Sequence, residues 1–222
     1  MDDADASSLS SDKCGPKELD ACALLSTPLA WHLASCLVTT SVGGMYLAGS
    51  FKTYAVRTLS ASSLATISTT ASVFNSVGRI FWGYTADKIG SLPTLAVLAG
   101  LFSVIILTYS SSLEIGGEAG FALSTYLLFF FEGGNFALYM PITIQLFGSR
   151  WSSSNYGLIF TLFSLSAMMN IIFLSRLKVD FWTASASMGL FTLTGFINVM
   201  LFIRHVHVRA TGGASIFSCA RF

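Results

Sequence analysis

One carboxyl group stands out in the sequence because it lies in the middle of a long apolar stretch. Glu132 follows three phenylalanines and precedes Gly133, Gly134 and Asn135. A charged side chain at the centre of a bilayer costs about 2.5–3.5 kcal/mol on insertion scales, so such a residue usually faces a cavity or a partner. Removal from water favours the neutral acid, which can carry a proton. We interpret Glu132 as a candidate proton carrier; the alternative is a structural hydrogen bond to Asn135 or to a neighbouring helix.

Arg79 is the second candidate, and it lies near the end of an earlier apolar stretch. Its guanidinium suits an anion on the cytoplasmic side of a membrane, and it equally suits contact with lipid headgroups. Asn75 lies one helical turn before Arg79 and is placed to orient it. We therefore assign Glu132, Asn135, Asn75 and Arg79 to one path along which a solute could cross.

Residues that let a helix bend accompany Glu132. Gly133 and Gly134 follow it directly, and Pro141 comes later in the same apolar stretch. Glycine and proline allow a helix to bend or to approach a neighbour closely. We interpret these three residues as sites of helix flexing, with ordinary packing as the alternative.

A short turn with glycines and charges connects two apolar stretches. It contains Gly83, Asp87, Lys88 and Gly90 in the pattern Gly-x-x-x-Asp-Lys-x-Gly. Asp87 can accept hydrogen bonds from the free N–H groups at the start of the following helix, and Lys88 can pair with carboxylates or lipid phosphates. Such a cluster can hold two helices in a closed state, although an ordinary capped turn has the same composition. We interpret the four residues as a cytoplasmic gating motif.

The three histidines are expected to be structural. His32 lies early in an apolar stretch, where a histidine is more often hydrogen bonded than part of a proton relay. His205 and His207 alternate with valines near the end of the chain. We interpret these two as interfacial residues and not as a metal site.

The composition predicts a membrane protein. Of the 222 residues, 53% are hydrophobic and only 10% are charged, whereas a soluble domain carries about 25% charged residues. The net charge of +1 gives no indication of a nucleic-acid partner. No cofactor is expected, because the four cysteines form no CxxC pair. An enzyme is not expected either, because HExxH, a phosphate-binding loop and a GxSxG with a plausible base are absent.

Six apolar stretches are each long enough to cross the ~30 Å hydrocarbon core as a helix. The predicted fold is therefore an all-α membrane protein with spans at residues 29–50, 61–84, 93–110, 120–147, 156–175 and 184–203. The second span is rich in Ser and Thr, which suits a helix beside a water-filled path. Residues 1–23 are polar and are expected to be a disordered cytoplasmic segment, and residues 205–222 are expected to be a cytoplasmic tail.

The distribution of basic residues predicts the orientation. Six spans place both termini on one side of the membrane. With the termini inside, eight Lys and Arg residues lie on the inner side and four lie on the outer side. The positive-inside rule therefore favours cytoplasmic termini, in a plasma membrane or an organelle membrane.

The charged turn is part of a longer pattern that resembles the major facilitator superfamily. The pattern is Asn75-x-x-Gly78-Arg79-x-x-x-Gly83-x-x-x-Asp87-Lys88-x-Gly90. The segment from Leu25 to Trp31 resembles the start of helix 7 in that family. The segment from Glu132 to Phe160 resembles helices 10 and 11 of its oxalate/formate antiporter and monocarboxylate-porter branch, with the plant nodulin-like branch as second choice. This resemblance covers residues 24–204 and implies that the six spans are the C-terminal half of a twelve-helix transporter.

The resemblance implies a secondary active transporter that moves a small organic anion, in particular a monocarboxylate, by alternating access. It would act as an antiporter with a counter-anion or as a symporter with a proton. Two departures, Ser91 and Asn170, stand where the family often has basic residues, and they weaken the case for a dicarboxylate. The alternative is a multi-pass scaffold or a regulatory half-transporter without transport activity.

Six spans alone lack the opposing half of such a transporter. Three explanations remain open, namely a truncated gene model, a shortened splice form, or a half-size protein that pairs with a second copy or another half. The acidic start of the chain is typical of the end of a central loop, and it favours truncation.

Overall fold

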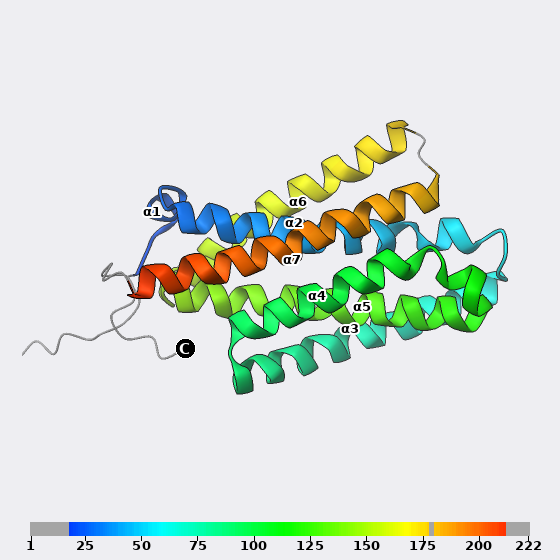
Figure 1. The fold of residues 1–222 in the computed structure, drawn as a ribbon, viewed down its shortest axis with the longest axis horizontal. Coiled ribbons are helices and arrows are strands. Elements are labelled where there is room, and N and C mark those ends of the chain that lie inside the picture. The colour runs from blue at the N-terminus through cyan, green and yellow to red at the C-terminus, as the bar shows by residue number, and fades with distance from the viewer. Residues whose placement is uncertain (1–17, 178–179, 212–222) are drawn as a thin grey trace, which may run out of the picture.

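The computed structural model describes residues 18–177 and 180–211, and every secondary-structure element in these ranges is helical (Figure 1). The elements are α1 (Ala21–Leu25), α2 (Pro28–Ala55), α3 (Ala61–Ile89), α4 (Ser91–Tyr109), α5 (Ser112–Phe147), α6 (Ser152–Leu177) and α7 (Phe181–Thr211). The six long helices run roughly along one axis in Figure 1. An all-helical architecture, as predicted, is therefore confirmed for the described residues.

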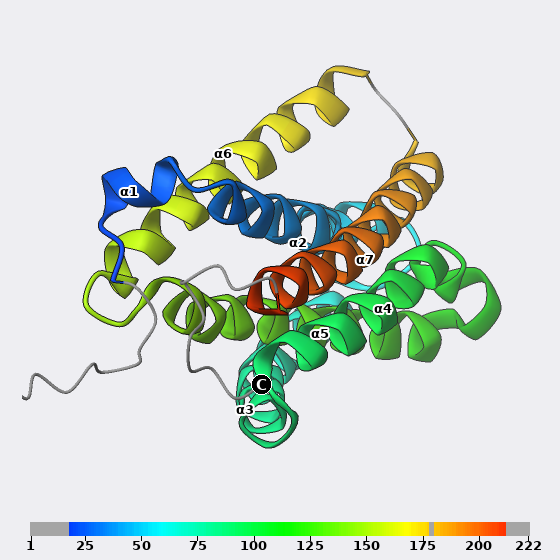
Figure 2. The same cartoon turned by 60° about the vertical axis from the view of Figure 1, so that its left-hand side comes forward.

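Two helices lie at the centre of the arrangement. α2 packs against α5, α6 and α7, and α5 packs against α2, α3, α4 and α6. Figure 2 shows α2 between α6 and α7. The two flanking helices, α3 and α6, therefore lie on either side of the α2–α5 pair.

A helix covers five of the six ranges for which a span is predicted, and α4 covers the remaining range, 93–110, except for its last residue. Three helices among the described residues are long and apolar enough to cross a membrane, namely Ser91–Tyr109, Ser112–Phe147 and Phe181–Arg209. α3 is less apolar because of its Ser and Thr side chains, several of which donate back to the carbonyl one turn earlier, as Thr69 does to Ala65 at 3.0 Å. Crossing by α2, α3 and α6 stays a prediction.

The segment expected to be disordered is ordered at its end. Glu18 accepts hydrogen bonds from the N–H groups of Ser149 (3.3 Å) and Arg150 (2.9 Å). The N–H of Leu19 donates to the Phe147 carbonyl at 3.2 Å. Disorder is thus the wrong prediction for residues 18–23, because they bind the α5–α6 connection; residues 1–17 lie outside the described ranges. At the other end α7 continues to Thr211, so residues 205–211 are helical, and residues 212–222 lie outside.

Glycines with positive φ set where two long helices end. Gly90 (φ 94°) ends α3, and Gly148 (φ 86°) ends α5. Glycine adopts this conformation without the steric cost that a side chain brings. In α5 the non-helical residue is Gly117 (φ 57°), which lies before the predicted span, and the helix runs on through Pro141.

Candidate functional site

Arg79 lines a cleft of about 490 Å³ between α3 and α6. α2 and α5 contribute one residue each, and α6 contributes most of the opposite wall. The other lining residues are Met45, Phe136, Tyr156, Phe160, Phe163, Ser164, Ala167 and Met168. The cleft therefore combines one cationic side chain with an apolar and aromatic wall.

Asn75 positions the Arg79 side chain. The Nε of Arg79 donates to the Asn75 Oδ1 at 3.3 Å. The Asn75 Nδ2 in turn donates to the backbone carbonyl of Phe129 on α5 at 3.0 Å. Because a guanidinium has five N–H donors, this contact leaves four others for a ligand. The contact predicted between Asn75 and Arg79 is present.

Four aromatic rings form the wall that Arg79 faces across the cleft. Ring centroids lie 5.6 Å apart for Phe136 and Phe160, and 5.4 Å apart for Phe136 and Phe163. Phe160 also lies 5.6 Å from Tyr156 and 5.2 Å from Phe163. Such spacings are typical of favourable aromatic pairs. The rings join α5 to α6 and give the cleft a continuous apolar surface.

Glu132 is buried and does not line this cleft. Its side chain is 3% exposed, and neither carboxyl oxygen has a hydrogen-bond partner among the described residues. A Cβ added at Gly44 would overlap its Oε2 and the ring of Phe102, so the carboxyl group packs against α2 and α4. The cleft-lining residues Met45 and Phe136 follow Gly44 and Glu132 on their helices.

Asn135 does not bind Glu132, so the structural hydrogen bond that was the alternative for this pair is not formed among the described residues. The Asn135 Nδ2 donates instead to the Ser41 Oγ at 2.7 Å, and it lies 3.3 Å from the Thr40 Oγ1. Thr40 also contacts the Tyr139 hydroxyl at 2.9 Å. Asn135 is fully buried and joins α2 to α5, so the structure places it outside the cleft lining.

Glycines bring α3 and α5 into close contact. A Cβ at Gly78 would overlap the carbonyl of Phe130, and a Cβ at Gly133 would overlap the carbonyl of Asn75. A Cβ at Gly134 would overlap the ring of Trp82, whose Nε1 is buried without a partner among the described residues. These glycines therefore serve packing in the structure, and their part in helix flexing, like that of Pro141, stays a prediction.

We expect Gly133→Ala to lower stability, because the new methyl group must push α3 away from α5. Overpacking of this kind costs about 1–3 kcal/mol, which exceeds the gain in helix propensity of about 1 kcal/mol. Gly49→Ala is the matched control, since a Cβ there meets no atom within 4 Å. Thermal unfolding in detergent measures both variants. Equal unfolding temperatures would contradict the close contact at Gly133.

The charged turn lacks the side-chain cap predicted for it, and its role as a gating motif stays a prediction. Asp87 is exposed, and Gly90 is the N-cap of α4, which has no side-chain cap. A Cβ at Gly83 would meet no atom within 4 Å, so Gly83 permits no close helix contact here. Lys88 lies over the ring of Tyr84, with its Nζ 5.3 Å from the centroid. The predicted capping by Asp87 is wrong because the positive φ of Gly90 redirects the chain first.

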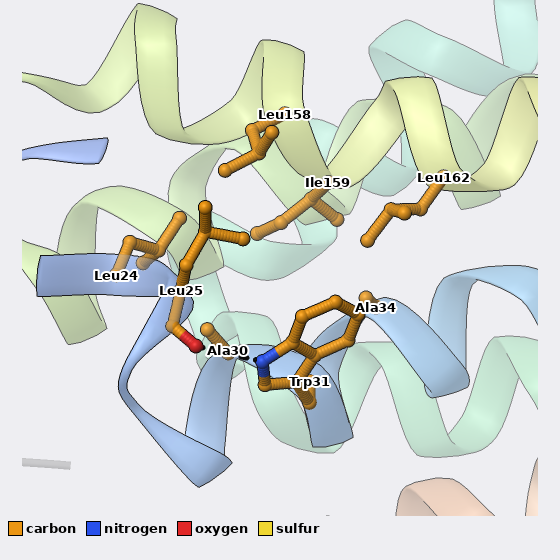
Figure 3. A pocket seen from close by; sticks show the side chains of 8 residues that line it. All are labelled: Leu24, Leu25, Ala30, Trp31, Ala34, Leu158, Ile159 and Leu162. Carbon is orange, nitrogen blue, oxygen red and sulfur yellow. Dashed lines mark hydrogen bonds between the residues drawn. The ribbon is translucent and has the colours of Figure 1, made fainter. Parts of the chain in front are cut away.

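A second, very small pocket lies where α1 and α2 meet α6 (Figure 3). Its lining is apolar, and the Trp31 Nε1 donates to the Leu25 carbonyl at 2.8 Å. Its volume of about 10 Å³ matches a single water molecule. We therefore interpret it as a packing contact.

The sequence analysis missed most of the α6 wall. Tyr156, Phe160, Phe163 and Ala167 lie on one helical face at spacings of four, three and four residues. This periodicity was visible in the sequence. The periodicity did not indicate which helix lies across the cleft from this face of α6. Asn170 points elsewhere, because its Nδ2 lies 3.7 Å from the Met188 sulfur on α7.

Comparison with known proteins points to transport. No protein-family model matches the chain. The chain is 30% identical over 142 residues to an oxalate:formate antiporter from Oxalobacter formigenes, across 64% of this chain and 34% of that protein. It is 34% identical over 102 residues to apicoplast pyruvate carrier 1 from Toxoplasma gondii, across 46% of this chain and 18% of that protein.

The chain is homologous to transporters. It spans about a third of the length of the antiporter and under a fifth of the pyruvate carrier. Together with its apolar helices, this homology supports an integral membrane protein. The assignment to the C-terminal half of a twelve-helix transporter stays a prediction.

Proposed function

We propose that the chain is part of a secondary active transporter that carries a small monocarboxylate by alternating access. The observation that supports this most strongly is the cleft in which Arg79 faces four aromatic rings. Arg79 is the only charged side chain that the described residues bring to this cleft. The relatives' names agree in chemical class, since oxalate, formate and pyruvate are all carboxylates.

The cleft favours a substrate with one carboxylate. A guanidinium binds a carboxylate through two parallel hydrogen bonds. A second carboxylate on the substrate would lie against the aromatic wall without a cation to pair with it. The organic part of a monocarboxylate instead packs against the rings of Phe136 and Phe160, where it loses contact with water at little cost.

Alternating access requires a second set of helices across the cleft. We propose that this chain is the C-terminal half of a twelve-helix major facilitator fold, with both termini cytoplasmic, in a plasma or organelle membrane. An N-terminal half or a second copy would supply the opposing wall. Rocking of the two halves would expose Arg79 to one side of the membrane and then to the other.

Glu132 is the coupling group in this proposal. Its carboxyl group has no partner among the described residues to hold its proton in place, and Phe136, one turn along α5 from Glu132, lines the cleft. When water reaches it in one state, the acid releases its proton; when the cleft closes, removal from water favours proton uptake. Exchange for a counter-anion is the second possible coupling, and it would not need Glu132.

Uptake by the full-length protein in proteoliposomes tests the proposal. Labelled formate, pyruvate, lactate and oxalate are compared with a neutral amide of the same size, with and without a proton gradient. Saturable uptake of the monocarboxylates above oxalate and the amide is expected. Absence of uptake for all of them would favour the scaffold or regulatory alternative, and preference for oxalate would overturn the assignment of a monocarboxylate.

We expect Asn75→Leu to raise the KM for the carboxylate about tenfold with little change in maximal rate. The substitution removes the acceptor at 3.3 Å that orients the Arg79 side chain, and a hydrogen bond to a charged group contributes about 1.5–3 kcal/mol. Asn75→Asp keeps an acceptor at this position and should restore a KM near the wild-type value. Initial uptake rates over a range of substrate concentrations separate the two parameters. A fall in maximal rate at unchanged KM would contradict the orienting role.

A further inference from the structure

A polar cluster joins α2 to α7 on the opposite side of α2 from α6. His32 of α2 lies between two polar groups of α7. Its Nδ1 is 3.2 Å from the Nδ1 of His205, and its Nε2 is 3.1 Å from the Oδ1 of Asn198. A Cβ at Gly195 would overlap the backbone at Thr39, so the two helices are in close contact here. The structure confirms that His32 is hydrogen bonded, as expected.

The orientation of the Asn198 amide follows from its other contacts. Its Nδ2 donates to the Ser35 Oγ at 3.0 Å, and it lies 3.4 Å from the Thr39 Oγ1. The Ser35 hydroxyl uses its own proton to donate to the His32 carbonyl at 2.7 Å, so it must accept from Asn198. The carbonyl oxygen of Asn198 therefore faces the His32 Nε2, and it requires an N–H there.

The same hydrogen bonds determine which ring nitrogens of His32 and His205 carry a proton when both residues are neutral. With its proton on Nε2, neutral His32 presents a lone pair at Nδ1. His205 must then donate its Nδ1–H across the 3.2 Å contact. A proton added to His32 reverses only this one bond, since His32 Nδ1–H now donates to His205, whose own proton moves to Nε2. Both N–H groups of the His32 imidazolium then have an acceptor on α7.

We propose that His32 is a proton-binding site, held by the His205 and Asn198 acceptors of α7, and that this site keeps α2 joined to α7 whether or not the proton is bound. A second proton, on His205, would place N–H groups on both facing nitrogens and break the contact. The site is distinct from Glu132 and from the cleft, and it stands whether or not the chain transports carboxylates.

The surroundings favour His32 over His205 as the holder of the proton. Arg209 lies one turn along α7 from His205, so a positive charge on that ring would stand beside the Arg209 guanidinium. Phe202 of α7 meets the His32 ring edge to face, with centroids 5.1 Å apart. Cys36, one turn along α2, is buried. On α6, which also packs against α2, the titratable side chain that the structure describes is Tyr156, and it lines the cleft.

Nitrogen-15 NMR of the histidine rings in the full-length protein tests the site, with signals assigned from His32→Gln, His205→Gln and His207→Gln variants. On lowering the pH from about 8 to 5, we expect His32 to gain a proton first, with N–H on both nitrogens, while His205 stays neutral. Asn198→Leu should weaken proton binding at His32 about tenfold, and Asn198→Asp should strengthen it about tenfold, because one acceptor is removed or becomes charged. His207→Gln should leave it unchanged.

Two results would overturn the proposal. One is a first proton on His205. The other is a His32 titration that stays within twofold of wild type in both Asn198 variants. If Asn198→Leu does not fold, Asn198→Asp alone decides, since it keeps the size and the acceptor oxygen. Uptake measurements are not needed, so a failure of the transport proposal would leave this result intact.

Discussion

Replacing Arg79 with glutamine in the full-length protein is expected to reduce monocarboxylate uptake about a hundredfold at substrate concentrations below KM. Arg79 is the only charge that the described residues bring to the cleft, and losing one partner of a hydrogen-bonded charge pair costs about 2–5 kcal/mol. Arg79→Lys keeps the charge but loses the two parallel hydrogen bonds, so an intermediate loss of about tenfold is expected. Initial rates of labelled uptake in proteoliposomes measure both effects.

Arg57→Gln is the matched control for Arg79. Arg57 follows the end of α2 and lines a different cleft, together with Tyr54, Glu114 and Asp180. Its loss removes one positive charge from the protein without touching the Arg79 cleft. Uptake should then stay near the wild-type rate. Equal losses in Arg57→Gln and Arg79→Gln would mean that the effect comes from net charge or orientation, and Arg79 would lose its proposed role in binding.

The helices were the part of the structure that sequence could predict. Long apolar stretches form helices because only internal hydrogen bonds satisfy the backbone away from water. The ends of helices could also be predicted where a glycine with positive φ fixes them, as Gly90 and Gly148 do for α3 and α5. The end of α7 was placed too early because the basic residues after Arg204 were assigned to a tail, although they continue the helix to Thr211.

The hydrogen-bond partners of polar side chains could not be predicted from the sequence. A hydrogen bond between Asn135 and Glu132, one turn away, was an alternative left open by the sequence, yet Asn135 binds Ser41 on another helix. Glu18 was placed in a disordered segment, yet it accepts hydrogen bonds from two N–H groups of the α5–α6 connection. The hydrogen-bond partners of both side chains depend on which helices pack together. Local composition carries no information about contacts between residues about 100 positions apart.

The candidate site was predicted in part for the same reason. Asn75 and Arg79 lie one turn apart on a single helix, so their contact could be inferred from spacing. The facing wall comes from α6, and its distance from α3 is set by the α2–α5 pair between them. The carboxyl group of Glu132 was recognised by its position in an apolar stretch, but its burial against Gly44 and Phe102 rather than in the cleft was not.

Replacing Glu132 with leucine is expected to raise the stability of the protein while it abolishes proton-driven uptake. The carboxyl group is buried with neither oxygen paired among the described residues. An unsatisfied buried polar group costs about 1–3 kcal/mol, and an apolar side chain of similar size removes that cost. The unfolding temperature in detergent should therefore rise, whereas accumulation of monocarboxylate driven by a proton gradient should fall to the level seen without a gradient.

Glu132→Gln and substrate exchange distinguish coupling from general damage. Glutamine keeps the size of the side chain and cannot release a proton, so it should also lose gradient-driven accumulation. Exchange of labelled for unlabelled substrate across the membrane at equal pH needs no net proton movement, and it should persist in both variants if the cleft is intact. Loss of stability in Glu132→Leu together with unchanged accumulation would make Glu132 a structural residue. Higher stability together with lost accumulation would show that the buried acid lowers stability and is nevertheless required for coupling. This combination is expected of a residue that carries the proton in transport.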